Sequence, residues 1–352
     1  MSIVIAKGSG HAIRLEPTGV KDEDFLQRFV AENPHCLPVD EIEDDLALSI
    51  VAREFPTGSG PIDVLALDQN GGVYLIETKL YKNPDKRHVV AQVLDYAASI
   101  WANFSDADEF RQQLDACARN LKAKSLNEIL ISDLGVEPDQ CSKLVASAAQ
   151  NCEDGAFRFL VLMDRMGDRL KRLIRYVNRF CRFDLYGVEF EFYEHDDLHI
   201  AIPRLYGTES VKVVDGGRST WNEDKYFDHV QETLGDKGVQ ALRPLFDHCV
   251  NSASSVTWGT GRLAGSFNPK YDSVSQKSVL TAYSDGNLAL SFGWHPTEGE
   301  PFERLMKFRS LIEKELSISI PEDKLKTGYT LSFDAWSPHV QNICEAISES
   351  FC

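Results

Sequence analysis

Three charged residues interrupt a stretch that otherwise predicts two buried β-strands. Residues 60–80 read GPIDVLALDQNGGVYLIETKL, two apolar runs around a turn, with Asp63 in the first run and Glu77 and Lys79 near the end of the second. A buried charged side chain is stable only beside an opposite charge, hydrogen-bond partners or a metal ion. These three residues are therefore the first candidates for a functional site.

The turn between the two runs decides whether the charges meet. Residues 68–71, Asp-Gln-Asn-Gly, fit a type I turn followed by a glycine in the left-handed conformation. This turn places Asp63 opposite Glu77, on the face that also carries Lys79, and predicts a positive φ at Gly71. A two-residue Asn-Gly loop would instead shift the pairing by one residue and separate the two carboxylates. The two registers therefore predict different sites.

Two carboxylates beside a lysine suit the hydrolysis of phosphodiester bonds. Mg²⁺ prefers oxygen ligands and commonly takes only one or two protein carboxylates, which leaves positions for water and phosphate. The metal neutralises phosphate charge and lowers the pKa of a bound water. A neighbouring lysine can orient that water and stabilise the transition state. The first register thus predicts a site for Mg²⁺, or for Mn²⁺ in its place.

The elements expected around this hairpin build an α/β domain. Apolar periodicity predicts a helix at 22–32, which ends before a proline, and a strand at 46–55. After the hairpin we expect, in order, a helix from Pro84 to about Trp101, several short helices at about 106–150, a buried strand at 157–163, a helix at 168–182 and a hairpin at 185–205.

The chain of 352 residues is long enough for two domains. We predict a first domain at 1–209 with a helical insertion at about 105–150, a polar linker at 210–222, and a C-terminal α+β domain of unassigned role at 223–352. The elements expected in the C-terminal domain are two helices at about 225–252, strands near 254–266, 277–284 and 287–294, a helix near 300–315, a strand near 328–334 and a helix near 337–350.

The order of elements and the charged hairpin together resemble the PD-(D/E)XK nucleases. Ile62-Asp63 followed by Glu77-Thr78-Lys79 is similar to their active-site signature. The element order is similar to the αβββαβ core of the restriction-endonuclease-like fold, a mixed central sheet flanked by helices. QVLDY adds Gln92 and Tyr96 one helical turn apart, a QxxxY pair typical of NucS-like and RecB-like members. The resemblance covers roughly residues 20–205.

The resemblance implies a Mg²⁺-dependent nuclease that acts on DNA in repair, restriction or phage defence. Its metal ligands would be Asp63, Glu77 and the backbone carbonyl of Thr78, and Lys79 would position the attacking water. Gln92 and Tyr96 would hold the phosphate or orient the water shell of the metal.

Two further features of the sequence bear on this resemblance. Many family members supply an additional acidic residue, for which Glu32 and Glu54 are candidates; we prefer Glu54 because it lies on the strand beside the hairpin. Close relatives often carry a basic residue where this chain has Pro61, which leaves the level of activity open.

Nucleic-acid binding has to rely on local basic patches, because the net charge of −17 repels a polyanion. Lys82, Lys86 and Arg87 follow the active-site strand and are placed to contact phosphates. The segment 165–182 contains seven bases and one acid. Its expected apolar stripe is Leu170, Leu173, Ile174, Val177 and Cys181. The stripe leaves five arginines largely outside, for DNA or for acids of the same protein: Arg169, Arg172, Arg175, Arg179 and Arg182.

Other interpretations stay open. A catalytically idle module with the nuclease fold, binding nucleic acid or a protein partner, would explain the acidity and Pro61. The sequence does not distinguish DNA from RNA, and the resemblance admits a homodimer. Eight scattered cysteines without metal-binding spacing, no long apolar run and no signal-peptide pattern favour a cytoplasmic protein without a membrane partner.

Overall fold

The structure of the protein is a computed structural model. It describes residues 2–6, 12–43, 46–83, 88–103, 107–181, 183–196, 198–208, 221–259 and 264–352. The chain forms two compact units. The first unit consists of residues 1–42, 48–129 and 142–217, and the second of residues 43–47, 130–141 and 218–352. Among the described residues, no helix has the length and apolar character needed to cross a membrane.

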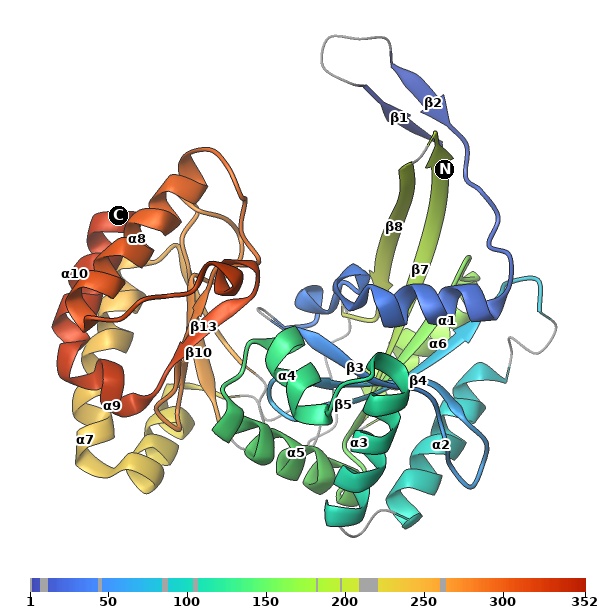
Figure 1. Ribbon diagram of the computed structural model, residues 1–352, viewed down its shortest axis with the longest axis horizontal. Helices are drawn as coiled ribbons and strands as arrows, with labels where there is room; N and C mark the ends of the chain where they lie inside the picture. Colours follow the sequence, from blue (N-terminus) through green and yellow to red (C-terminus); the bar gives the residue numbers. More distant parts are fainter. Residues whose placement is uncertain are drawn as a thin grey trace. The chain divides into compact units, whose positions relative to one another are not determined.

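A six-stranded mixed sheet forms the centre of the first unit (Figure 1). The first three strands pair antiparallel, the next two join in parallel, and the last closes an antiparallel hairpin. In spatial order the strands are β3 (Leu48–Phe55), β4 (Ile62–Asp68), β5 (Val73–Lys79), β6 (Phe157–Met163), β7 (Asp184–His195) and β8 (Leu198–Tyr206). A separate two-stranded sheet contains β1 (Ile3–Ile5) and β2 (Ile13–Leu15).

The helices of this part of the chain fall close to the predicted positions. They are α1 (Glu23–Glu32), α2 (Val89–Asn103), α3 (Ala107–Lys122), α4 (Leu126–Leu134), α5 (Pro138–Glu153) and α6 (Asp168–Phe180). Asp22 caps α1, because its Oδ1 accepts a hydrogen bond of 2.8 Å from the Phe25 N–H. α2 begins at Val89, and residues 84–87, where its start was predicted, lie outside the described residues.

The hairpin of β4 and β5 adopts the register that the type I turn predicts. Gly71 has φ +79°, and the Asp68 N–H donates to the Gly72 carbonyl at 3.1 Å. Val64 pairs with Ile76, so the preceding and following residues, Asp63 and Glu77, stand opposite each other. The alternative two-residue loop is excluded.

Helix α6 covers the face of the sheet on which Glu77 lies. Glu77 pairs with Val161 of β6, and Val161 pairs with Gly187 of β7, so these three positions share a face. A Cβ at Gly187 would lie 2.4 Å from the Met166 side chain and 2.8 Å from that of Ile174. Glycine at this position leaves room for the ends of the Met166 and Ile174 side chains against β7.

Helix α1 runs across the opposite face of the sheet (Figure 1). Its Phe25 and Phe29 rings contact the ring of Phe192 edge-on, at centroid distances of 5.5 and 5.2 Å. Phe192 is an odd number of residues from Gly187 along β7, and therefore points away from α6. The carboxylates of the hairpin thus lie on the α6 side of the sheet, with α1 behind them.

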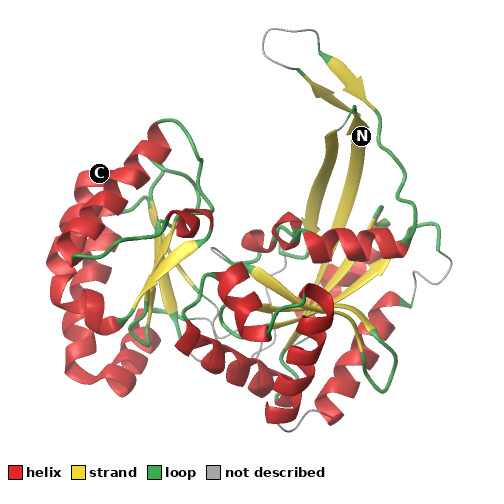
Figure 2. Cartoon of the chain, in the orientation of Figure 1, coloured by secondary structure: helices red, strands yellow, loops and turns green. Residues whose placement is uncertain are grey.

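The second unit packs helices on one side of an antiparallel sheet of five strands (Figure 2). The strands are β9 (Ser255–Trp258), β10 (Ser266–Lys270), β11 (Leu280–Tyr283), β12 (Leu288–Ser291) and β13 (Gly328–Leu331). The helices are α7 (Glu223–Ser252), α8 (Glu300–Leu316), α9 (Phe333–Trp336) and α10 (Val340–Phe351). α7 is two helices that meet at Gly235, where φ is +66°.

One predicted strand in this unit is wrong. The sequence predicts a single strand near 254–266, whereas β9 and β10 are separate antiparallel neighbours. The Gly259 N–H donates to the Ser266 carbonyl at 2.9 Å, which closes the ladder where the chain reverses. The residues between β9 and β10 therefore connect two strands; residues 260–263 lie outside the described residues.

Candidate active site

Glu77 and Lys79 form a buried ion pair at the end of β5. Lys79 Nζ lies 3.3 Å from Glu77 Oε1, and only 2% of the Glu77 surface is exposed. The second oxygen, Glu77 Oε2, is buried without a hydrogen-bond partner. Because leaving a charged oxygen buried and unpaired is costly, this atom requires a ligand or a proton.

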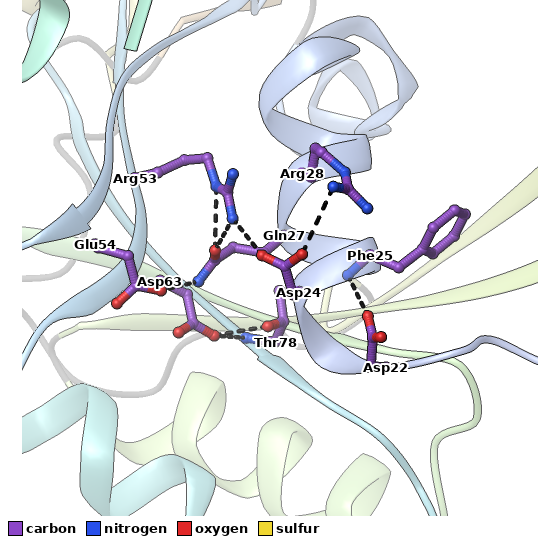
Figure 3. A network of polar contacts seen from close by, with 9 residues as sticks. All are labelled: Asp22, Asp24, Phe25, Gln27, Arg28, Arg53, Glu54, Asp63 and Thr78. Carbon is purple, nitrogen blue, oxygen red and sulfur yellow. Dashed lines mark hydrogen bonds and ion pairs between the residues drawn. The ribbon is translucent and has the colours of Figure 1, made fainter. Parts of the chain in front are cut away.

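Asp63 reaches the same strand end from β4. Its Oδ2 accepts hydrogen bonds from both the N–H and the hydroxyl of Thr78, each at 2.7 Å (Figure 3). Thr78 thereby fixes the orientation of the Asp63 carboxylate. The structure thus places Asp63, Glu77 and Lys79 at one strand end, where Thr78, between Glu77 and Lys79 in the sequence, holds the Asp63 carboxylate.

The charges of the site shift its pKa values in the direction expected for crowded acids. Burial, and then the charge of Asp63, raises the pKa of Glu77 to about 8. Burial also raises the pKa of Asp63, against the hydrogen bonds of Thr78. Burial alone would lower the pKa of Lys79, but the charges of Glu77 and Glu23 raise it above its ordinary value. The site holds more negative than positive charge and therefore favours a bound cation.

Glu23 is an acid of the site that the sequence analysis missed. Its Oε2 lies 3.7 Å from Lys79 Nζ, and its Oε1 accepts from the Leu80 N–H and the Asn83 side-chain amide, both at 3.0 Å. The structure corrects the choice of Glu32, which is exposed at the far end of α1, about 13 Å along the helix from Glu23. The only local signal is a place in the first helical turn, where acids are common in any protein.

Glu54, the preferred additional acid, stands beside Asp63. Arg53 pairs with Val64 and Phe55 with Ile62, which puts Glu54 opposite Asp63. Its backbone has φ +51°, a conformation that non-glycine residues rarely adopt outside functional or strained positions. The charge of Glu54 contributes to the raised pKa of Asp63.

A hydrogen-bonded network from α1 holds Glu54 in this position (Figure 3). The amide nitrogen of Gln27 donates to Glu54 Oε1 at 2.6 Å, and its oxygen accepts from the Arg53 guanidinium. Arg53 in turn lies 2.8 Å from Asp24 Oδ1. Gln27 is only 4% exposed, so both ends of its amide depend on these partners. The network fixes the strained backbone of β3 next to the site.

Helix α2 brings Gln92 and Tyr96 to the carboxylates. The Gln92 side chain hydrogen-bonds the Tyr96 hydroxyl, and burial followed by the charges of Glu77 and Asp63 raises the pKa of Tyr96. The Tyr96 ring packs 3.7 Å from the position of a Cβ at Gly60. Tyr96 therefore feels the charges of the predicted site, and Gln92 is its hydrogen-bond partner.

The basic residues predicted for nucleic-acid binding are only partly described. Lys82 is exposed, and its Nζ lies 3.4 Å from the Lys21 carbonyl. Lys86 and Arg87 lie outside the described residues. Three arginines on α6 are exposed, as predicted: Arg169, Arg172 and Arg175.

The apolar stripe predicted for α6 is wrong at Leu173, which is 40% exposed. The face of α6 that packs on the sheet is centred on Ile174, Val177 and Asn178. Asn178 is buried because it donates to the Gly207 carbonyl and accepts from the Leu185 N–H, both at 2.8 Å. A polar side chain thus occupies part of the buried face of α6, which apolar periodicity alone does not predict.

The donor set suits a hard cation. Among the described residues, no group of three or more His, Cys, Asp and Glu side chains is arranged as a metal site. Mg²⁺ does not need such a group, because it keeps several waters and binds through one or two carboxylates. Asp63 and Glu77 supply two carboxylates, and the unpartnered Glu77 Oε2 supplies a free acceptor. The residues present therefore fit Mg²⁺ or Mn²⁺.

Three curated proteins, each named Endonuclease NucS, are similar to part of this chain. The relative from Corynebacterium efficiens is 33% identical over 87 residues, which cover 24% of this chain and 35% of the relative. The relatives from Kocuria rhizophila and Bifidobacterium animalis subsp. lactis are 38% and 36% identical over 71 and 77 residues, which cover 28% and 30% of the relatives.

The chain thus spans about a third of the length of the curated relatives that it matches. No protein-family model and no solved structure matches the chain. The partial similarities support a nuclease-like relationship, and the mixed sheet with its flanking helices is compatible with a nuclease fold.

Proposed function

We propose that this protein is a nuclease of the PD-(D/E)XK type that hydrolyses phosphodiester bonds in DNA with Mg²⁺ or Mn²⁺. One observation carries the proposal: Glu77 Oε2 is buried without a hydrogen-bond partner, in a site where Asp63 adds a second acid. A cation bound at this oxygen would supply the missing partner and offset the cost of burying the carboxylate.

The residues of the hairpin divide the work. Asp63 and Glu77 would hold the metal together with the Thr78 backbone carbonyl, and water molecules would fill its other positions. The bound metal would supply charge neutralisation at the phosphate and a more acidic water. Lys79, held between Glu77 and Glu23, would position the attacking water by donating a hydrogen bond to it.

Residues outside the hairpin would bind the substrate. Gln92 and Tyr96 lie on one helical face beside the carboxylates and would hold the scissile phosphate or orient the water shell of the metal. Glu54 would complete the acidic side of the site. Phosphates farther along the DNA would contact basic side chains in two segments. The first segment contains Lys82, Lys86 and Arg87, and the second is the exposed face of α6 with Arg169, Arg172 and Arg175.

The similarity to proteins named Endonuclease NucS supports internal cleavage of DNA over other nuclease reactions. Repair, restriction and phage defence would all use this chemistry. The idle-module interpretation needs no metal and no water-positioning lysine, so the lysine separates the two hypotheses.

Cleavage assays with Lys79→Ala test the proposal. Supercoiled plasmid and single-stranded DNA are incubated with Mg²⁺ or Mn²⁺, and the variant is expected to cut at least about a hundredfold more slowly. Lys171→Ala is the matched control, because Lys171 also pairs with a largely buried acid on the same face, Glu189, at 3.3 Å. Metal-dependent cleavage that survives Lys79→Ala unchanged would contradict the assigned site, and DNA binding without any cleavage would favour the idle module.

A further inference from the structure

The outer face of α6 exposes two aromatic rings side by side. Tyr176 is 60% exposed and Phe180 is 47% exposed. Their ring centroids lie 5.0 Å apart with an interplanar angle of 47°. Two large rings left in water on one helix form an apolar surface that favours a ligand with flat apolar faces.

Arginines border this aromatic pair. Arg172 precedes Tyr176 by four residues and Arg179 follows it by three, so both are its neighbours on the helix surface. The Arg179 guanidinium lies 5.6 Å from the centre of the Phe180 ring. Within the described chain, no ion pair joins Arg172 or Arg179 to an acid. Among the described residues of this acidic protein, two arginines thus border an exposed aromatic pair without an ion pair.

This face begins next to the candidate active site. Met163 at the end of β6 pairs with Lys79, and the following residue, Asp164, accepts from the Tyr81 N–H at 2.7 Å. The Arg165 guanidinium lies 4.9 Å from the centre of the Tyr81 ring. Tyr176 lies eight residues into α6, about 12 Å along its axis. Basic and aromatic side chains therefore follow one another from the end of β6, beside the candidate active site, along α6.

Duplex and single-stranded DNA differ in what they offer such a surface. Both present phosphates to arginines, but only a single strand presents unstacked bases to aromatic rings. Arginine also stacks on bases, which adds to the contact. The combination of rings and arginines is therefore more specific than a basic patch, which would serve either form.

We propose that the face of α6 formed by Arg172, Tyr176, Arg179 and Phe180 binds single-stranded DNA. Bases stack on Tyr176 and Phe180, the two arginines contact the phosphates, and the strand continues toward Lys79. This inference rests on the proposed function for its substrate, DNA, and deepens it by assigning an unpaired strand to one surface of the molecule.

Binding measured without metal tests the surface separately from cleavage. Fluorescence anisotropy in EDTA compares a labelled 20-nucleotide oligo(dT) with a blunt 20-base-pair duplex. The double variant Tyr176→Ala/Phe180→Ala is expected to lose at least about tenfold in affinity for oligo(dT), with an unchanged salt slope and less than about twofold loss for duplex. Arg172→Ala is expected to reduce the salt slope for oligo(dT) by about 0.7.

Trp101→Ala is the matched control. Trp101 lies on α2 of the same unit and is 59% exposed, so its substitution removes a similarly exposed ring from a different helix. Unchanged oligo(dT) binding in this variant, together with the loss at Tyr176 and Phe180, supports the proposal. An equal loss of oligo(dT) affinity in the double variant and in Trp101→Ala would show non-specific apolar contact and overturn the proposal.

Two other outcomes also overturn the assignment. Unchanged oligo(dT) affinity in the double variant would show that the rings do not stack on bases. Loss of a dimer in sedimentation, with DNA affinity intact, would show that a second copy covers the face. Neither outcome depends on cleavage, whereas failure of the nuclease proposal would appear as absent cleavage by a protein that still binds oligo(dT) through α6.

Discussion

The two ends of the hairpin formed by β4 and β5 each bury an acid, but in different states. At the turn end, Asp68 is fully buried, with Oδ1 accepting from the N–H groups of Asn70 and Gly72 at 2.8 and 2.7 Å. Its Oδ2 lies 2.8 Å from the Arg158 guanidinium. At the open end, Glu77 has Lys79 beside one oxygen and no hydrogen-bond partner for the other.

The difference separates a structural acid from a functional one. Asp68 closes the turn and ties it to β6 through Arg158, so its hydrogen-bond capacity is used by the protein itself. Glu77 has one oxygen without a hydrogen-bond partner, and the charge of the neighbouring Asp63 makes the ionised form of Glu77 less favourable. Burial alone does not distinguish the two residues. The number of satisfied oxygens does, and it predicts opposite results for substitution at the two ends.

The largest expected effect is the loss of catalysis in Glu77→Gln. Glutamine keeps the size of the side chain but removes the charge that would hold the metal. The rate of DNA cleavage should fall at least about a hundredfold. The free energy of unfolding should stay equal or rise, because the buried carboxylate with an unpartnered oxygen is removed while Lys79 keeps Glu23 as a counter-charge. Single-turnover cleavage and urea unfolding of the same preparation measure both quantities.

A parent-like cleavage rate in Glu77→Gln would show that the open end is not the active site. A large loss of stability would show that Glu77, like Asp68, holds the fold together. Either result would remove the contrast between the two ends of the hairpin.

The next effect is the loss of stability in Asp68→Asn. The substitution keeps an oxygen for the turn but leaves the Arg158 guanidinium without its buried counter-charge. Breaking a buried ion pair by removing one partner costs about 3–5 kcal/mol of unfolding free energy. Chemical denaturation should show this loss, whereas the cleavage rate per folded molecule should stay close to that of the parent. A lower rate with unchanged stability would contradict the structural role.

Gly71→Ala tests the turn itself and should cost less. A Cβ at this position would lie 2.5 Å from the Ser147 Cβ, and the backbone has φ +79°. We expect a loss of about 2 kcal/mol in unfolding free energy, measured in urea. Gly19→Ala is the control, because a Cβ there meets no atom within 4 Å. Equal stability of the two variants would contradict the packing of the turn against α5.

The two ends also differ in how far the sequence predicts them. Turn chemistry is local, so four residues reduce the register of the hairpin to two alternatives, and the type I alternative that the structure adopts also predicts the positive φ of Gly71. Glu23 reaches the site through contacts with residues 56 or more positions away, such as Lys79, and nothing in its own neighbourhood marks it. The predicted burial of Leu173 is wrong for a related reason. The buried face of α6 includes Asn178, whose hydrogen bonds go to distant backbone groups that apolar periodicity does not register.

A pH dependence is expected at the open end alone. The pKa of Glu77 is about 8 in the folded protein, against an ordinary value of 4.5 for a glutamate in the unfolded chain. Its protonation therefore stabilises the fold fully below about pH 4.5, and this contribution is lost as the pH rises through about 8. In EDTA, the melting temperature of Glu77→Gln should gain a few degrees on that of the parent between pH 5 and pH 8.5, because glutamine stays neutral.

Mg²⁺ should reverse this difference, since a bound cation stabilises the charged carboxylate of the parent and has no such group in Glu77→Gln. At pH 8.5, added Mg²⁺ should raise the melting temperature of the parent and leave that of Glu77→Gln unchanged. Asp68→Asn serves as the comparison from the turn end, and its response to Mg²⁺ should equal that of the parent. If the gap between the parent and Glu77→Gln stays constant across pH in EDTA, Glu77 is already stably charged in the fold, and the need for a cation at Oε2 disappears with it.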